Sequence, residues 1–142
     1  MEDQELGEML AGIESYRAER TISTTNTDKF CEAICAFAND FPIHQKPGVL
    51  FIGAGDDGSC GNITVTDQLL LSLADLRSNG NITRFPAMQV QKRSLLGCEM
   101  VVIIVHPSDD PPVRYRGRTW IRVGPRRAVA TPEEERQSAT RI

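Results

Sequence analysis

Two spacings of apolar residues alternate along the chain, and this alternation constrains the fold more than any other feature. Apolar side chains recur every three to four residues from Leu6 to Ile13, from Phe30 to Phe37 and from Leu69 to Leu76, as in helices that bury one stripe. Short apolar runs between and after them are typical of strands. Because the order does not repeat as strand–helix–strand, we predict a mixed α+β domain of the α/β class, a mixed β-sheet flanked by helices.

The individual elements follow from these patterns and from local turn and capping signals. Helices are expected over residues 3–15, 28–39 and 67–76, and strands over 49–52, 87–92, 99–105, 113–115 and 119–123. Thr25 or Thr27 can cap the second helix, and Thr66 the third. Asp56 to Gly58 predicts a hairpin turn. Residues 22–27 are expected to be an edge strand or a loop.

The length of the chain fits one domain. A chain of 142 residues can bury about 70% of the surface that its unfolded form exposes, without a metal or a disulfide. The polar last ten residues predict a helix or a frayed linker, so we expect a domain over residues 1–132 and a polar C-terminal tail over 133–142. We find no apolar run of about 18 residues and no secretory signal, and therefore expect a cytoplasmic protein with no membrane partner.

The four cysteines, Cys31, Cys35, Cys60 and Cys98, match no zinc-binding spacing. Cys31 and Cys35 are one helical turn apart on an apolar helix. Free cysteine is among the residues that proteins bury most often. We therefore expect buried, reduced thiols and no metal site at these residues.

The segment from Val113 to Arg127, VRYRGRTWIRVGPRR, is dense in arginine and contains no acid. Charge is unevenly divided, because residues 1–75 carry a net charge of −9 and residues 84–127 carry +6. Guanidinium groups bind phosphate oxygens in bidentate fashion, and an aromatic ring can stack on an unpaired base. The predicted nucleic-acid-binding residues are Arg114, Arg116, Arg118, Trp120, Arg122, Arg126 and Arg127, with Tyr115 as an alternative stacking ring. The alternative is that these arginines pair with the acidic half of the chain.

Residues Gly53 to Gly58, GAGDDG, match the pattern GxGxxG and follow a predicted strand. The next residues, SCGNITVT, favour turns and strands, whereas a dinucleotide site needs the start of a helix there. A hairpin turn is therefore the favoured interpretation, and dinucleotide binding is the alternative.

Carboxylates form a further candidate site. Glu14, Glu19 and the adjacent pair Asp56 and Asp57 offer oxygen ligands for Mg²⁺ or Mn²⁺, and such ions can activate water against phosphodiesters. On one continuous helix the two glutamates would point about 140° apart. They can converge only if the helix ends between them. The alternative is a set of separate, solvated side chains.

Four segments carry a family resemblance. They are AICAFAND at Ala33 to Asp40, VLFIGAGDDG at Val49 to Gly58, PSDDPPVRYRGRTWIRVG at Pro107 to Gly124 and ATPEE at Ala130 to Glu134. In this order they make the chain similar to the Schlafen-type Alba-like domain, the Schlafen AlbA domain, of DNA-binding regulators and Schlafen proteins. The resemblance spans nearly the whole chain. It implies a mixed α/β domain that binds DNA or RNA, often within a larger transcriptional regulator.

The Schlafen resemblance also implies a candidate metal site. In the members that cut RNA, two glutamates five residues apart and a later aspartate hold a metal ion, and Glu14, Glu19 and Asp56 lie where that pattern falls. Asp57 is the alternative third ligand. The dipeptide Arg20-Thr21 follows the second glutamate, where those members usually carry an aromatic residue and a lysine.

Three functions follow from these patterns. The strands expected at 113–115 and 119–123 should pair through a turn at Arg116-Gly117-Arg118, and we call this pair the arginine hairpin. The leading hypothesis is a nucleic-acid-binding domain that contacts the phosphate backbone through this hairpin, with little base readout. The second is a Schlafen-like metal-dependent endoribonuclease, and only this function requires a cofactor, Mg²⁺ or Mn²⁺. The third is a protein-interaction or homo-oligomerisation module in which the hairpin meets an acidic patch on a second copy.

Overall fold

Two four-stranded sheets and four α-helices make up the part of the chain that the computed structural model describes, residues 1–12, 17–41 and 43–139. The elements in chain order are α1 (Asp3–Ala11), β1 (Ala18–Thr21), α2 (Thr27–Asn39), β2 (Gly48–Ile52), α3 (Asp67–Ala74), the 3₁₀-helix η1 (Asp75–Ser78), β3 (Ile82–Thr83), β4 (Met88–Leu95), β5 (Cys98–Val105), β6 (Arg114–Tyr115), β7 (Arg118–Val123), β8 (Arg126–Val129) and α4 (Pro132–Ala139). This architecture confirms the predicted α+β fold with helices flanking a mixed sheet.

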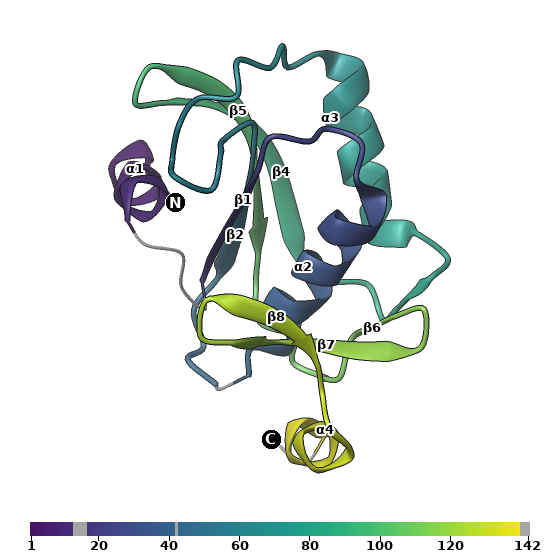
Figure 1. Cartoon of the computed structure of the whole chain (residues 1–142). Coiled ribbons are helices and arrows are strands. Elements are labelled where there is room, and N and C mark those ends of the chain that lie inside the picture. The colour runs from purple at the N-terminus through teal and green to yellow at the C-terminus, as the bar shows by residue number, and fades with distance from the viewer. Residues whose placement is uncertain (13–16, 42, 140–142) are drawn as a thin grey trace.

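The first sheet has the strand order β1-β2-β5-β4, in which β1 is parallel to β2 and the other pairs are antiparallel. Helix α1 covers one face, and α2 and α3 cover the other (Figure 1). Side chains alternate between the two faces of a strand. Because both faces are covered, β2 and β5 are buried along nearly their whole length, which explains their continuous apolar sequences.

The second sheet, with the order β3-β6-β7-β8, packs against α2. Helix α2 therefore touches both sheets, and almost all of its residues from Phe30 to Asn39 are buried. Asn39 lies at its C-terminal end and is fully buried. Its amide nitrogen donates to the carbonyl oxygens of Val113 (2.9 Å) and Trp120 (2.7 Å), and its amide oxygen accepts from the backbone N–H of Val113 (2.6 Å). These three bonds fix the second sheet to the helix.

Two helix ends differ from the prediction for local reasons. Helix α1 ends at Ala11 because Gly12 adopts an extended conformation, and residues 13–15 of the predicted helix lie outside the described residues. The cap of α2 is Asn26, whose side chain accepts from the backbone N–H of Lys29 at 3.1 Å, so the prediction of Thr25 or Thr27 is wrong. Asparagine is as good a cap as threonine, and the sequence alone did not separate them.

Three strands were not predicted. Strand β1 ends at Thr21, just before the segment at residues 22–27, whose first residues form a loop. Strand β3 pairs with β6, and β8, which begins in the arginine-rich segment, pairs with β7. All three are edge strands of two to four residues, too short to show a clear apolar pattern.

Helix α4 begins with a capping box. The hydroxyl of Thr131 accepts from the backbone N–H of Glu134 (3.1 Å), and the Glu134 carboxylate accepts from the backbone N–H of Thr131 (2.9 Å). The described C-terminal residues, up to Ala139, are thus helical, one of the two predicted alternatives. None of the described helices combines the length and the apolar character that crossing a membrane requires.

Cys60 and Cys98 form a disulfide, so the prediction of reduced thiols is wrong for these two residues. An antiparallel bridge between Ala54 and Cys60 turns the chain back, which brings Cys60 to the start of β5. Cys31 and Cys35 are buried free thiols, as predicted. Burial raises the pKa of Cys31 to about 11 and that of Cys35 to about 12.

Candidate functional site

A cleft of about 690 Å³ lies beside β1, an edge strand of the first sheet. It is bounded by the end of α1, the first turn of α2, the loop after β2 and the hairpin that joins β7 to β8. The lining residues are Gly12, Glu19, Arg20, Lys29, Asp56, Asp57, Arg122, Pro125, Arg126 and Arg127. The cleft therefore brings together members of the arginine segment and of the carboxylate set, which the sequence predicted separately.

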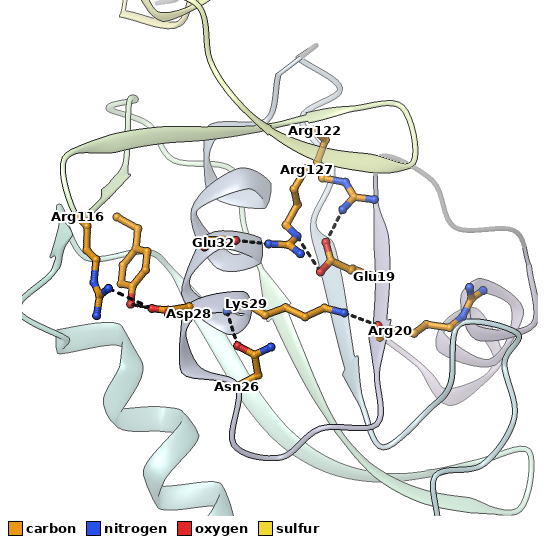
Figure 2. Close-up of polar contacts among 10 residues, drawn as sticks. Glu19, Arg20, Asn26, Asp28, Lys29, Glu32, Arg116, Arg122 and Arg127 are labelled. Atoms are coloured by element: carbon orange, nitrogen blue, oxygen red, sulfur yellow. Dashed lines mark hydrogen bonds and ion pairs between the residues drawn. The ribbon is translucent and has the colours of Figure 1, made fainter.

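Glu19 is the centre of a buried group of ion pairs that we call the Glu19 cluster: Glu19, Glu32, Arg122 and Arg127. The Arg122 Nη1 lies 2.5 Å from Glu19 Oε1, and these side chains are only 2% and 5% exposed. The Arg127 Nε lies 3.0 Å from Glu19 Oε2, and its Nη1 pairs with Glu32 (Figure 2). Both carboxylate oxygens of Glu19 are thus engaged by guanidinium groups. Arg122 is part of the core and is not available to a ligand.

Arg20 points away from Glu19, because adjacent residues of a strand face opposite sides (Figure 2). Its buried guanidinium donates to the carbonyl oxygens of Leu10 (2.8 Å) and Gly12 at the end of α1. It also donates to the carbonyl oxygen of Asp56 at 3.3 Å. The last carbonyls of a helix have no partners within the helix. Arg20 therefore caps α1 and attaches it to the loop after β2.

Two cations that are not buried reach the cleft with no acidic partner among the described residues, Lys29 and Arg126. Lys29 stands in the first turn of α2, and its Nζ donates to the carbonyl oxygen of Arg20 at 3.3 Å (Figure 2). Arg126 begins β8 and is exposed. Lys29 was not among the site residues predicted from the sequence. The feature that could have identified it is its positive charge in the first turn of a helix, a position where the helix dipole disfavours a cation.

The loop from Gly53 to Cys60, which we call the acidic loop, supplies Asp56 and Asp57 to the cleft. Both are exposed, and hydrogen bonds from Ser59 lower the pKa of Asp57. The loop contains a turn after β2, as predicted, and no helix begins there, which is contrary to a dinucleotide site. Glu14 lies outside the described residues. Within the described ranges, no three acidic, histidine or cysteine side chains are placed to hold a metal ion.

The other members of the arginine segment lie apart from the cleft. Arg114 pairs with Glu135 of α4, and Arg116 lies 3.6 Å from Asp28. Arg118 is exposed and has no acidic partner in the part of the chain that the structure describes. The six arginines thus do not form one exposed surface, and four of them pair with acids.

The predicted stacking rings are also wholly or partly occupied. Tyr115 is buried and donates its hydroxyl to Asp28 Oδ1 at 2.6 Å, and burial raises its pKa to about 12. Trp120 is partly buried and packs against the core. Tyr115 therefore has no free face for a base, whereas Trp120 keeps part of its surface exposed.

Comparisons with known proteins give a family and a fold. The family model described as Schlafen, AlbA_2 matches residues 14–131. No curated protein matches. The crystal structure of the DIP2311 protein from Corynebacterium diphtheriae is 20% identical with a TM-score of 0.52, covering 82% of this chain but only 22% of that protein. The solution structure of the N-terminal domain of an ATP-dependent DNA helicase RecG-related protein from Nitrosomonas europaea is 20% identical with a TM-score of 0.51, covering 78% of this chain and 75% of that one.

Proposed function

Because this chain belongs to the Schlafen, AlbA_2 family, we propose that it is a nucleic-acid-binding domain whose cleft holds the phosphate backbone. The observation that carries the proposal is that Lys29 and Arg126 reach the same cleft without acidic partners among the described residues. The neighbour from Nitrosomonas europaea supports it, because the name of that protein relates it to a DNA helicase.

The cations of the cleft differ in their availability to phosphate. Lys29 and Arg126 can donate charge-assisted hydrogen bonds to phosphate oxygens directly. Arg127 can do so only in competition with Glu19 and Glu32, which already hold it. Arg122 is buried in its ion pair and serves to position the hairpin. Lys29 and Arg126 are therefore the primary phosphate contacts.

The chemistry of the cleft favours binding that is independent of sequence. Contacts to phosphate fix the position of a strand but carry no base information. No aromatic residue lies among the described residues that line the cleft, so a base finds no ring to stack on. We therefore retain the expectation of little base readout.

Arg118 lies at the opposite end of β7 from the cleft. It shares a face of the second sheet with Trp120 and Arg122, whereas Arg126 pairs with Val123 on the other face. Arg118 is therefore not expected to contact a strand held in the cleft.

We expect the double variant Lys29→Gln/Arg126→Gln to bind a single-stranded oligonucleotide more weakly and with less dependence on salt. If three to five cations contact phosphates of a single strand, the slope of log affinity against log salt is about −2 to −3.5, and each lost contact reduces its magnitude by about 0.7. Fluorescence anisotropy at several salt concentrations measures both quantities.

The matched control is Arg84→Gln/Lys92→Gln, which removes the same charge outside the cleft, from side chains paired with Asp110 and Glu99. This control should keep the slope of the unmodified chain. Equal losses in the two double variants would show that net charge alone attracts the nucleic acid. Binding that does not change with salt would reject the phosphate contacts altogether.

Metal-dependent RNA cleavage is the second candidate function, and one observation favours it: Glu19 and Asp56 line the same cleft as the cations. In that function they would hold Mg²⁺ or Mn²⁺ together with Glu14. Both oxygens of Glu19 face guanidinium groups, so a metal ion would compete with Arg122 and Arg127 for this carboxylate.

Incubation of a structured RNA with and without Mn²⁺ tests the cleavage function. If the chain cleaves RNA in this way, cleavage should require the metal, should fall at least a hundredfold in Asp56→Asn, and should persist in Asp109→Asn, an exposed aspartate outside the cleft. Intact RNA under all conditions would exclude cleavage and would leave the binding function standing.

A further inference from the structure

The Cys60–Cys98 disulfide lies at the base of the acidic loop. Cys60 ends the loop, and Cys98 is the first residue of β5, 38 positions later in the sequence, with 5.6 Å between the Cα atoms. The same loop presents Asp56 and Asp57 to the cleft. A covalent bond thus connects the acidic side of the cleft to the first sheet.

Few other polar contacts hold the tip of this loop. The backbone N–H groups of Gly55 and Gly58 bond to carbonyl oxygens within the loop itself. Two described bonds connect residues 55–60 to the rest of the chain. One is the disulfide, and the other is the 3.3 Å hydrogen bond from Arg20 to the Asp56 carbonyl oxygen. The base of the loop is also closed by the Ala54–Cys60 bridge and by the bond from the Gly61 N–H to the Gly53 carbonyl oxygen at 2.7 Å. The disulfide adds a covalent restraint to these backbone contacts.

The two cysteine pairs differ in their access to a reagent. Cys60 is exposed, and its partner Cys98 is buried. Cys31 and Cys35 are fully buried, and burial raises the pKa of both thiols to about 11 and 12. Thiol–disulfide exchange requires access and an ionised thiol. The chain thus combines one accessible disulfide with two thiols that should stay inert.

We propose that Cys60 and Cys98 form a reversible dithiol–disulfide switch that sets the freedom of the acidic loop, and through it the affinity of the cleft for phosphate. A dithiol reductant attacks Cys60 Sγ as a thiolate, the sulfur–sulfur bond breaks, and Cys98 leaves as a thiolate that takes up a proton. The second thiol of the reductant then displaces Cys60 as a thiol. The reductant ends as a disulfide, having given two electrons and two protons to the cysteine pair.

The effect on binding rests on the proposed function, whereas the redox change does not. In the oxidised chain, Asp56 and Asp57 are held at the cleft, where they repel a phosphate. After reduction the loop can move away from the bound strand. Removing one like-charge contact at about 4 Å in water corresponds to roughly a fivefold change in affinity. We expect the reduced chain to bind an oligonucleotide about fivefold more tightly.

The test begins with the air-oxidised chain, alkylated by iodoacetamide under native conditions before and after treatment with dithiothreitol. Mass spectrometry should find no alkylation before reduction and alkylation of the exposed Cys60 after it, with the buried Cys31 and Cys35 unmodified in both samples. Hydrogen exchange at residues 55–60 should become faster after reduction, while exchange in α2 stays the same. Alkylation of Cys60 without reductant, or unchanged exchange in the loop, would overturn the switch.

Two variants separate this inference from the proposed function. Cys60→Ser/Cys98→Ser should match the reduced chain and ignore dithiothreitol. Asp56→Asn/Asp57→Asn should bind tightly in both redox states, because the repelling charges are gone. Hydrogen exchange in the loop could become faster after reduction in a chain that binds no oligonucleotide. That result would reject the proposed function and the effect on the cleft, and would keep the redox switch of the loop. Binding that is equal in the oxidised and reduced chains would reject the effect on the cleft alone.

Discussion

Replacement of Arg122 by methionine is expected to lower the free energy of unfolding by about 3–5 kcal/mol. Its side chain is 2% exposed, and its partner Glu19 is 5% exposed. The substitution leaves a buried carboxylate with Arg127 as its remaining ion-pair partner among those described. It also removes the guanidinium that lies 5.3 Å from the centre of the Phe37 ring. Urea denaturation followed by circular dichroism measures the loss.

The matched control for Arg122 is Arg118→Met in the same strand. Arg118 is exposed, so the expected change is within about 0.5 kcal/mol. The double variant Glu19→Gln/Arg122→Met should recover part of the lost stability, because it leaves no buried unpaired carboxylate at this position. If Arg122→Met were as stable as Arg118→Met, the ion pair would not be buried in solution.

Replacement of Asn39 by leucine is expected to lower the free energy of unfolding by about 3–5 kcal/mol. Leucine has a similar size but leaves three backbone groups without their partner, the N–H and carbonyl of Val113 and the carbonyl of Trp120. Each buried polar group that loses its partner costs about 1–3 kcal/mol. Thermal unfolding and urea denaturation should agree on the size of this loss.

Asn26→Ala provides the comparison, because it removes an asparagine from the opposite end of the same helix. Asn26 is exposed and makes one cap bond, to the backbone N–H of Lys29, so its removal should cost only about 1 kcal/mol. A loss at Asn39 no larger than that at Asn26 would mean that water reaches the Val113 and Trp120 groups.

The sequence predicted those parts of the fold that depend on neighbouring residues. The stripe from Phe30 to Phe37 and the apolar run from Val49 to Ile52 each contain enough residues to reveal their period. The turn predicted at Asp56 to Gly58 is also present, and Gly58 has a positive φ angle there. In each case the pattern and the structure that it produces occupy the same short segment.

The parts that were missed depend on distant residues. Arg122 and Glu19 are 103 positions apart, and nothing near either one shows that they pair. The sequence therefore left two alternatives for the arginine segment, one exposed surface or pairing with the acidic half, and the acids of β1 and α2 do neutralise part of it. The Cys60–Cys98 disulfide was missed for the same reason, because the fold and not the spacing of the two cysteines brings them together.

The Glu19 cluster joins β1 of the first sheet to the hairpin of the second. A substitution of Glu19 would therefore be expected to release one side of the cleft from the other and to alter its width. Loss of activity in such a variant would be poor proof of a chemical role, since a displaced hairpin would have the same result. Asp56 and Lys29 lie outside the Glu19 cluster, so substitutions at these two residues test a chemical role more directly.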